Sequence, residues 1–223
     1  MGDANSRHTV VLFGDSHSVM WTPALKVAAA RAHWKFFPVV KEACGYDWYV
    51  NYQDQLPANN QCTLWYRWAL VQLARLHPDV IVMGTYANTT WWKEGQIQVL
   101  NDLHRFAPRV ILLSDTPWIG SPADCLLTRG ATQGTCLKTL RPLVIALNHQ
   151  SARVARASHS QFLNTFGWFC LAARCPSLID GLVPFYDGAH LTPEYSRYLG
   201  PALADALNLT GTAVRPVANS GGA

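Results

Sequence analysis

Five short apolar runs recur along the chain and alternate with segments of helical periodicity. The runs, each of strand length, are residues 8–13, 34–40, 79–84, 109–114 and 161–166. The segments predicted as helices are residues 19–32, 64–76, 95–106 and 140–158, with a last helix after Thr192. Strands that alternate with helices predict an α/β fold, namely a doubly wound, flavodoxin-like sheet of five parallel strands with helices on both faces.

The length of 223 residues suits one α/β domain with a sizeable core. We assign residues 8–209 to this domain, residues 1–7 to a remnant of cloning or of a linker, and the polar, glycine-rich residues 210–223 to a flexible tail. Ligands of doubly wound sheets bind beyond the carboxyl ends of the strands. The chemistry of this chain is therefore expected in the turns and loops that follow its strands.

The composition is that of a folded protein with no sign of nucleic-acid binding. Hydrophobic residues make up 49% of the chain and charged residues 14%, which argues against disorder. The formal net charge is +4, but the Lys and Arg residues are scattered singly and form no basic run. The sequence has no apolar stretch of transmembrane length, and its first residues lack the basic and apolar regions of a signal peptide.

The nine Trp residues add a candidate binding surface. Several fall in segments that read as loops, where large rings often line a ligand groove. These are Trp48, Trp65, Trp91, Trp92 and Trp118. Packing beneath long loops would explain the same positions equally well, so both interpretations stay open.

The six cysteines point to disulfides rather than to a zinc site, because none of them forms a CxxC pair. Many pairings are possible. Closeness in sequence favours Cys44 with Cys62, Cys125 with Cys136, and Cys170 with Cys175. Disulfides indicate an oxidising, extracytoplasmic compartment. Since no export signal is visible, we expect the chain to be a domain cut from a larger, exported protein.

Ser16 is the first candidate for chemistry. It follows the apolar run 8–13 in the sequence Gly14-Asp15-Ser16 and opens a helical segment. Unpaired backbone N–H groups and the helix dipole favour negative charge at such a position. A serine there can attack a carbonyl group while its own N–H supports the oxyanion. Taken alone, Ser16 could equally be a helix cap.

Asp187 and His190 supply the groups that a serine nucleophile needs. A serine hydroxyl requires a base, and an imidazole with a pKa of about 6.5 suits that task. A nearby carboxylate fixes the tautomer of the imidazole and stabilises its charged form. Each residue alone could be an ordinary turn or surface residue. Together with Ser16, however, they predict a catalytic triad.

The two segments resemble the terminal blocks of a known family. Val11-Leu12-Phe13-Gly14-Asp15-Ser16-His17 resembles the first block of the SGNH (GDSL-like) hydrolases, and Asp187-Gly188-Ala189-His190-Leu191-Thr192 resembles their last. The resemblance extends from about residue 8 to residue 209 and implies the SGNH hydrolase fold. It also implies catalysis through an acyl-serine intermediate.

A narrower resemblance concerns the C-terminal third of the chain. The sequence Trp168-Phe169-Cys170, then Cys175-Pro176 and the Asp187 block, is similar to SGNH domains appended to membrane acyltransferases of the acyltransferase-three family. Those proteins O-acylate cell-envelope glycans. The resemblance implies a periplasmic or cell-surface location and a fused membrane acyltransferase domain, which would export the disulfide-containing part.

The resemblance also implies donors for an oxyanion hole beside Ser16. The family uses a glycine N–H after the second strand and an asparagine amide after the third, for which Gly45 and Asn88 are the candidates. Asn88 departs from the family spacing, because the segment from Gly84 has two extra residues, and it could be an ordinary loop residue. Asp15 is expected to hold its turn by accepting backbone N–H bonds. Three further histidines are read as ordinary, namely His17, His149 and His159.

We therefore expect a serine esterase or O-acyltransferase acting on cell-envelope glycan or a small acyl ester. Acetyl is the expected group, and succinyl the next candidate. A secreted carbohydrate esterase and a non-catalytic glycan-binding module are the alternatives. No His or carboxylate cluster has the spacing of metal ligands, so neither a metal nor another cofactor is expected. We expect a monomer.

Overall fold

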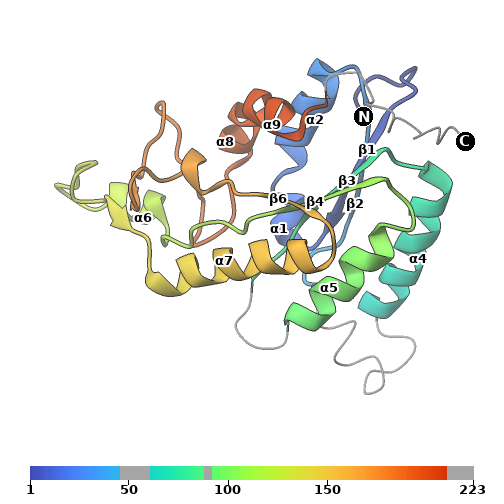
Figure 1. Cartoon of the computed structure of the whole chain (residues 1–223). Coiled ribbons are helices and arrows are strands. Elements are labelled where there is room, and N and C mark those ends of the chain that lie inside the picture. Colours follow the sequence, from blue (N-terminus) through green and yellow to red (C-terminus); the bar gives the residue numbers. More distant parts are fainter. Residues whose placement is uncertain (46–60, 88–91, 210–223) are drawn as a thin grey trace, which may run out of the picture.

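The computed structural model describes residues 1–45, 61–87 and 92–209, with the Trp92 side chain excepted. Its main sheet has five parallel strands in the order β2-β1-β3-β4-β6, which is the flavodoxin-like order (Figure 1). These strands are β1 (Thr9–Gly14), β2 (Lys35–Val40), β3 (Val80–Gly84), β4 (Arg109–Leu113) and β6 (Gln161–Leu163). The predicted fold class is confirmed.

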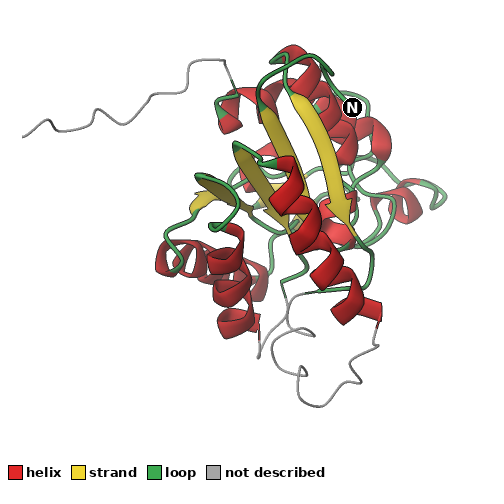
Figure 2. Cartoon of the chain, turned by 90° about the vertical axis from the view of Figure 1, so that its right-hand side faces the viewer, coloured by secondary structure: helices red, strands yellow, loops and turns green. Residues whose placement is uncertain are grey.

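Helices cover both faces of the sheet (Figures 1 and 2). One face carries α2 (Thr22–Arg31), α8 (Pro193–Tyr198) and α9 (Gly200–Leu207), and the other carries α4 (Gln61–Leu76), α5 (Trp92–Leu103) and α7 (Pro142–Ala157). Successive residues of each strand point to opposite faces. Val10 and Leu12 of β1 accordingly join one core, whereas Val11 and Phe13 join the other. Burial on both sides explains why the inner strands β1, β3 and β4 read as continuous apolar runs.

Most of the predicted helix 19–32 is α2, which begins at Thr22 with Pro23 in its first turn, and a separate short helix, α1 (Ser16–Val19), precedes it. A proline has no N–H to donate to the preceding turn, so a continuous helix would lose a hydrogen bond at Pro23. The break lets α1 stay short and close to the end of β1.

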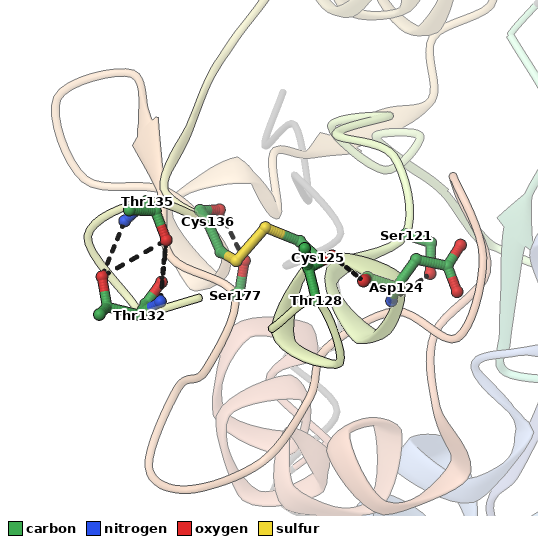
Figure 3. The surroundings of a disulfide bond; sticks show 8 residues. All are labelled: Ser121, Asp124, Cys125, Thr128, Thr132, Thr135, Cys136 and Ser177. Atoms are coloured by element: carbon green, nitrogen blue, oxygen red, sulfur yellow. Dashed lines mark hydrogen bonds between the residues drawn. A yellow bond between two sulfur atoms is a disulfide. The ribbon is translucent and has the colours of Figure 1, made fainter. Parts of the chain in front are cut away.

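The predicted long loop 116–139 contains structure of its own. It holds helix α6 (Pro122–Leu126) and ends in β5 (Lys138–Thr139), which pairs antiparallel with β7 (Arg174–Cys175). A short 3-10 helix, η1 (Phe166–Trp168), follows β6. Figure 3 shows how the Cys125–Cys136 disulfide and the bond from the Ser177 hydroxyl to the Cys136 carbonyl (2.7 Å) join these segments.

The first residues of the chain lie along the edge strand β2. Gly2 forms an antiparallel bridge with Lys35, and the Phe36 N–H donates to the Met1 carbonyl (2.8 Å). Residues 1–7, assigned to a remnant from the sequence, thus contact the sheet through their first positions. The predicted tail 210–223 lies outside the described residues. Within the described parts, no helix is both long and apolar enough to cross a bilayer.

All six cysteines form disulfides, in the pairs that closeness in sequence favours. Their partners are Cys44–Cys62, Cys125–Cys136 and Cys170–Cys175. No strand of the main sheet contains a cysteine, whereas Cys62 lies in α4, Cys125 in α6 and Cys175 in β7. The disulfides therefore join segments around the sheet rather than its strands.

Removing the Cys125–Cys136 disulfide should destabilise the fold. The bond closes a loop with a sequence separation of 11, and Cys136 is fully buried. We expect Cys125→Ala with Cys136→Ala to lower the free energy of unfolding by about 3 kcal/mol, because the unfolded chain gains freedom. Urea unfolding measures the change. The matched control is Cys170→Ala with Cys175→Ala, which opens a shorter loop and should cost less; equal stability of both variants and the parent would contradict the prediction.

Candidate active site

Ser16 stands in the tight turn between β1 and α1. Gly14 has a φ of 137°, and a Cβ there would lie 2.3 Å from the Gly84 carbonyl oxygen, so this close approach of β1 to β3 requires glycine. The buried Ser18 hydroxyl joins the same two strands. It accepts from the Gly84 N–H (2.8 Å) and lies 2.6 Å from the Phe13 carbonyl oxygen. These contacts fix α1, and with it Ser16, at the carboxyl end of the sheet.

Asp15 holds the turn, as the sequence predicts. Its carboxylate accepts from the N–H groups of His17 (2.8 Å) and Tyr86 (3.1 Å) and from the Thr85 hydroxyl (3.1 Å). Burial raises the pKa of Asp15, although the charge of His17 and the two N–H groups act in the opposite direction. The side chain caps α1 and ties it to the segment after β3.

A second loop brings Asp187 and His190 to the same edge of the sheet. Phe185 pairs with Leu191 in an antiparallel bridge, and the Thr192 hydroxyl donates to the Val183 carbonyl (2.6 Å) and caps α8. This closes the loop into a narrow hairpin. His190 lies at its end, immediately before the capped helix.

The structure brings together the three residues that the sequence predicts as a triad. His190 Nε2 lies 3.0 Å from Ser16 Oγ, and His190 Nδ1 lies 2.7 Å from Asp187 Oδ2. The other oxygen of Asp187 accepts from the N–H groups of Ala189 and His190, both at 2.7 Å. Burial alone would raise the pKa of Asp187, but these N–H groups and the His190 ring hold it below its usual range.

This arrangement suits general-base activation of a hydroxyl. The carboxylate accepts at Nδ1 and so leaves Nε2 of the neutral ring as the acceptor that faces Ser16. The hydrogen bond from serine to histidine is within the range of a working nucleophile and base. The chain of contacts Asp187–His190–Ser16 can therefore withdraw a proton from Ser16 and deliver it elsewhere.

A second His–Asp pair, which the sequence does not reveal, packs against the first. His17 Nδ1 lies 2.5 Å from Asp115 Oδ1, and the two side chains are 3% and 7% exposed. The His17 ring centroid is 4.7 Å from that of His190. His17, which the sequence reads as an ordinary histidine, is buried and hydrogen-bonded to Asp115 beside the predicted triad. Asp115 lies two residues after the end of β4, and an acid at that place in a doubly wound sheet was the available signal.

Two of the three predicted oxyanion donors, Ser16 and Gly45, lie within the described residues. The Ser16 N–H opens α1 and has no acceptor among the described residues. Gly45 lines the same open cavity as Ser16 and His190, which has a volume of about 510 Å³. Asn88 lies outside the described residues.

Two grooves adjoin this cavity. On one side, Tyr86 and Trp118 stack with their ring centroids 5.0 Å apart and line a groove of about 490 Å³ together with Lys138 and Arg141. On the other side is a groove of about 370 Å³ with a mostly apolar lining. Its residues include Val19, Met20, Pro23, Tyr186, Leu191 and Pro193.

The tryptophans that the sequence offers as groove residues differ in their surroundings. Trp118 lines the groove, whereas the half-buried Trp65 packs on Phe13. Trp48 and Trp91 lie outside the described residues, as does the side chain of Trp92. Trp65 thus packs from α4 rather than from a loop, and a binding role for Trp118 stays a prediction.

His149 and His159 are exposed, as expected of ordinary histidines. In the part of the chain that the structure describes, no group of three or more His, Cys, Asp or Glu side chains could hold a metal ion.

The comparisons with known proteins point to one family. A family model described as the SGNH domain fused to AT3 domains matches residues 1–205. Among solved structures, the periplasmic domain of the lipopolysaccharide acetyltransferase of Salmonella ser. Paratyphi A is similar, with a TM-score of 0.71 and 12% identity over 92% of this chain and 85% of that one. Comparison with curated proteins gave no match.

A second solved structure has the same fold. It is a catalytic mutant of an acetylxylan esterase from Geobacillus stearothermophilus, with a TM-score of 0.53 and 11% identity over 96% of this chain and 99% of that one. At such identities the likeness concerns the fold. The sheet and its helices are those of the SGNH hydrolases.

Proposed function

Because the chain belongs to the family of SGNH domains fused to AT3 domains, we propose that it is a serine-dependent esterase or O-acyltransferase acting on cell-envelope glycan. Family membership supports acyl transfer or ester hydrolysis in general. The observation that carries the serine mechanism is the hydrogen-bonded chain from Asp187 through His190 to Ser16. In this proposal Ser16 is the nucleophile, His190 the base and Asp187 the residue that orients the base.

The proposed reaction has two halves. In the first, Ser16 Oγ attacks the acyl carbon, its proton passes to His190 Nε2, and the carbonyl oxygen becomes negatively charged. The carbon–oxygen bond to the leaving group then breaks, and His190 returns the proton to the departing alkoxide. In the second half, His190 takes a proton from water or from a sugar hydroxyl, whose oxygen attacks the acyl carbon. The bond between that carbon and Ser16 Oγ then breaks, and His190 returns the proton to Ser16.

The negative charge in both halves needs donors close to Ser16. We assign this role to the N–H groups of Ser16 and Gly45, and the assignment of Asn88 remains an expectation from the family. The unpaired N–H of Ser16 and the place of Gly45 in the cavity support the first two. Donors that are fixed before the reaction cost no reorganisation when the charge develops.

The two grooves suggest how a glycan ester would lie. Stacked aromatic rings with exposed cationic side chains beside them suit a sugar, whose faces are apolar and whose hydroxyls accept hydrogen bonds. The Tyr86–Trp118 groove is therefore assigned to the glycan, and the apolar groove on the other side of Ser16 to a short acyl group. The solved relatives are named as an acetyltransferase of lipopolysaccharide and an esterase of acetylxylan, so acetyl is the expected group.

The proposed setting is outside the cytoplasmic membrane. Three disulfides suit an oxidising compartment, and the family description includes fusion to AT3 domains. We propose that such a membrane domain supplies acyl groups in the whole protein. Without it, hydrolysis is the activity to expect, because a sugar hydroxyl must outcompete concentrated water. A free carbohydrate esterase is the alternative within the same chemistry.

The glycan assignment is tested by removing the two cations of the groove. We expect Lys138→Met with Arg141→Met to lower kcat/KM for an acetylated xylo-oligosaccharide about tenfold relative to kcat/KM for p-nitrophenyl acetate, because a hydrogen bond from a charged donor contributes about 1.5–3 kcal/mol. The ratio of the two values cancels any effect common to both esters.

Arg129→Met is the control, since Arg129 is an exposed cation of the same segment that does not line the groove. An unchanged ratio would contradict the assignment of the groove. Failure of the parent protein to hydrolyse either ester would contradict the enzymatic proposal and favour a non-catalytic glycan-binding module.

A further inference from the structure

The buried His17–Asp115 pair has contacts that packing alone does not explain. Asp115 accepts from the N–H groups of Ala87 (2.9 Å) and Thr116 (2.7 Å) and from the Trp118 indole (2.9 Å). These donors come from the segments after β3 and β4, so they fix the carboxylate in place. Asp115 in turn holds the His17 ring through Nδ1 at 2.5 Å.

The other nitrogen of His17 is available to a ligand. Nε2 has no hydrogen-bond partner among the described residues, and His17 lines the cavity that contains Ser16 and His190. Its ring makes an edge contact with Tyr86, at 5.1 Å between centroids, and a tilted contact with His190 at 4.7 Å. A ring with one nitrogen on a fixed carboxylate and the other unpaired in the cavity is oriented toward whatever occupies that cavity.

On this geometry, and on the function proposed above, we propose that His17 is a further catalytic residue, which donates a hydrogen bond from Nε2 to the substrate oxygen that becomes negatively charged. The donor complements the N–H groups of Ser16 and Gly45. Since Asp115 balances the charge of His17, the pair adds a donor without adding net charge next to His190.

The donor must be the protonated ring. In neutral His17 the single proton stays on Nδ1, which faces Asp115, so Nε2 can only accept. Burial by itself lowers the pKa of His17, but the charge and hydrogen bond of Asp115, with smaller contributions from Asp15 and Asp187, raise it above its usual value. The environment thus favours the form that can donate.

A pH profile follows from the two histidines. The base His190 accepts the proton of Ser16 and therefore acts as the neutral ring. The donor His17 must be protonated, so kcat falls as the pH passes the raised pKa of His17. The titratable groups that face His17 among the described residues are Asp15, Tyr86, Asp115, Asp187 and His190.

Three variants test the proposal through kcat for p-nitrophenyl acetate against pH. His17→Leu should lower kcat about 10²- to 10³-fold with little change in KM, the usual loss for one oxyanion donor. His17→Gln keeps an N–H donor that does not titrate, so it should recover part of kcat and lose the alkaline decline. Asp115→Asn should move the decline to lower pH, because burial, which lowers the pKa of His17, is then opposed only by the smaller contributions of Asp15 and Asp187.

Controls separate the donor role from other causes. His104→Gln changes a histidine that does not line the cavity and should keep the alkaline decline. Circular dichroism at each pH excludes unfolding. An alkaline decline that persists in folded His17→Gln would overturn the proposal. Absence of hydrolysis in the parent protein would instead overturn the proposed function, so the two failures are distinguishable.

Discussion

Replacing Ser16 by alanine is expected to lower kcat for p-nitrophenyl acetate by about 10⁴-fold or more. Ser16 is the only side chain of the cavity within hydrogen-bond distance of His190 Nε2 among the described residues. No other hydroxyl there can take over its attack. The same variant should lose covalent labelling by a serine-directed organophosphonate, which intact mass measures directly.

A matched control exists within the chain. The Ser160 hydroxyl lies 2.9 Å from His104 Nε2, a contact much like that of Ser16 with His190. Ser160 precedes β6, at the opposite edge of the sheet from the cavity, and its histidine has no carboxylate partner among the described residues. Ser160→Ala should keep full activity and labelling. Turnover that survives in folded Ser16→Ala would contradict the nucleophile assignment.

The comparison between Ser16 and Ser160 also shows what the sequence can reveal. Ser16 follows a buried strand and opens a helix, and both features are local patterns of apolar and polar positions. The strand end and the Asp187–His190 spacing were sufficient to predict that these residues meet. Doubly wound topology brings the carboxyl ends of distant strands to one edge, so local signals sufficed for a contact between residues 16 and 190.

His17 and Asp115 show why the rest of the site escaped prediction. Their contact joins residues with a sequence separation of 98 and depends on how far each side chain reaches after its strand or turn ends. No rule on residue spacing predicts such a contact. The break between α1 and α2 is different, because Pro23 is a local signal for it. The short elements of the loop 116–139, in contrast, depend on the Cys125–Cys136 disulfide and on pairing with β7. Their stability comes from tertiary contacts rather than from local propensity.

The second large effect concerns the coupling between Ser16 and His190. His190→Ala should lower kcat by nearly as much as Ser16→Ala, and the double variant should be little worse than either single one. The reason is physical: without the imidazole the serine hydroxyl keeps its proton, and without the serine the imidazole has nothing to activate. Steady-state kcat values for the four proteins measure the coupling. Independent contributions would instead multiply, and such a result would contradict a shared mechanism.

Asp187 sharpens this test because it acts on the serine only through His190. Its carboxylate is 44% exposed, whereas the histidine side chain is 25% exposed, so water can replace part of its stabilising effect on the charged imidazole. Asp187→Asn should therefore lower kcat less than His190→Ala does. We expect the kcat of Asp187→Asn to exceed that of His190→Ala by about 10-fold or more. Added to His190→Ala, it should cost almost nothing further, since the group it orients is gone. A further loss in that double variant would mean that Asp187 contacts the reaction by a route other than His190.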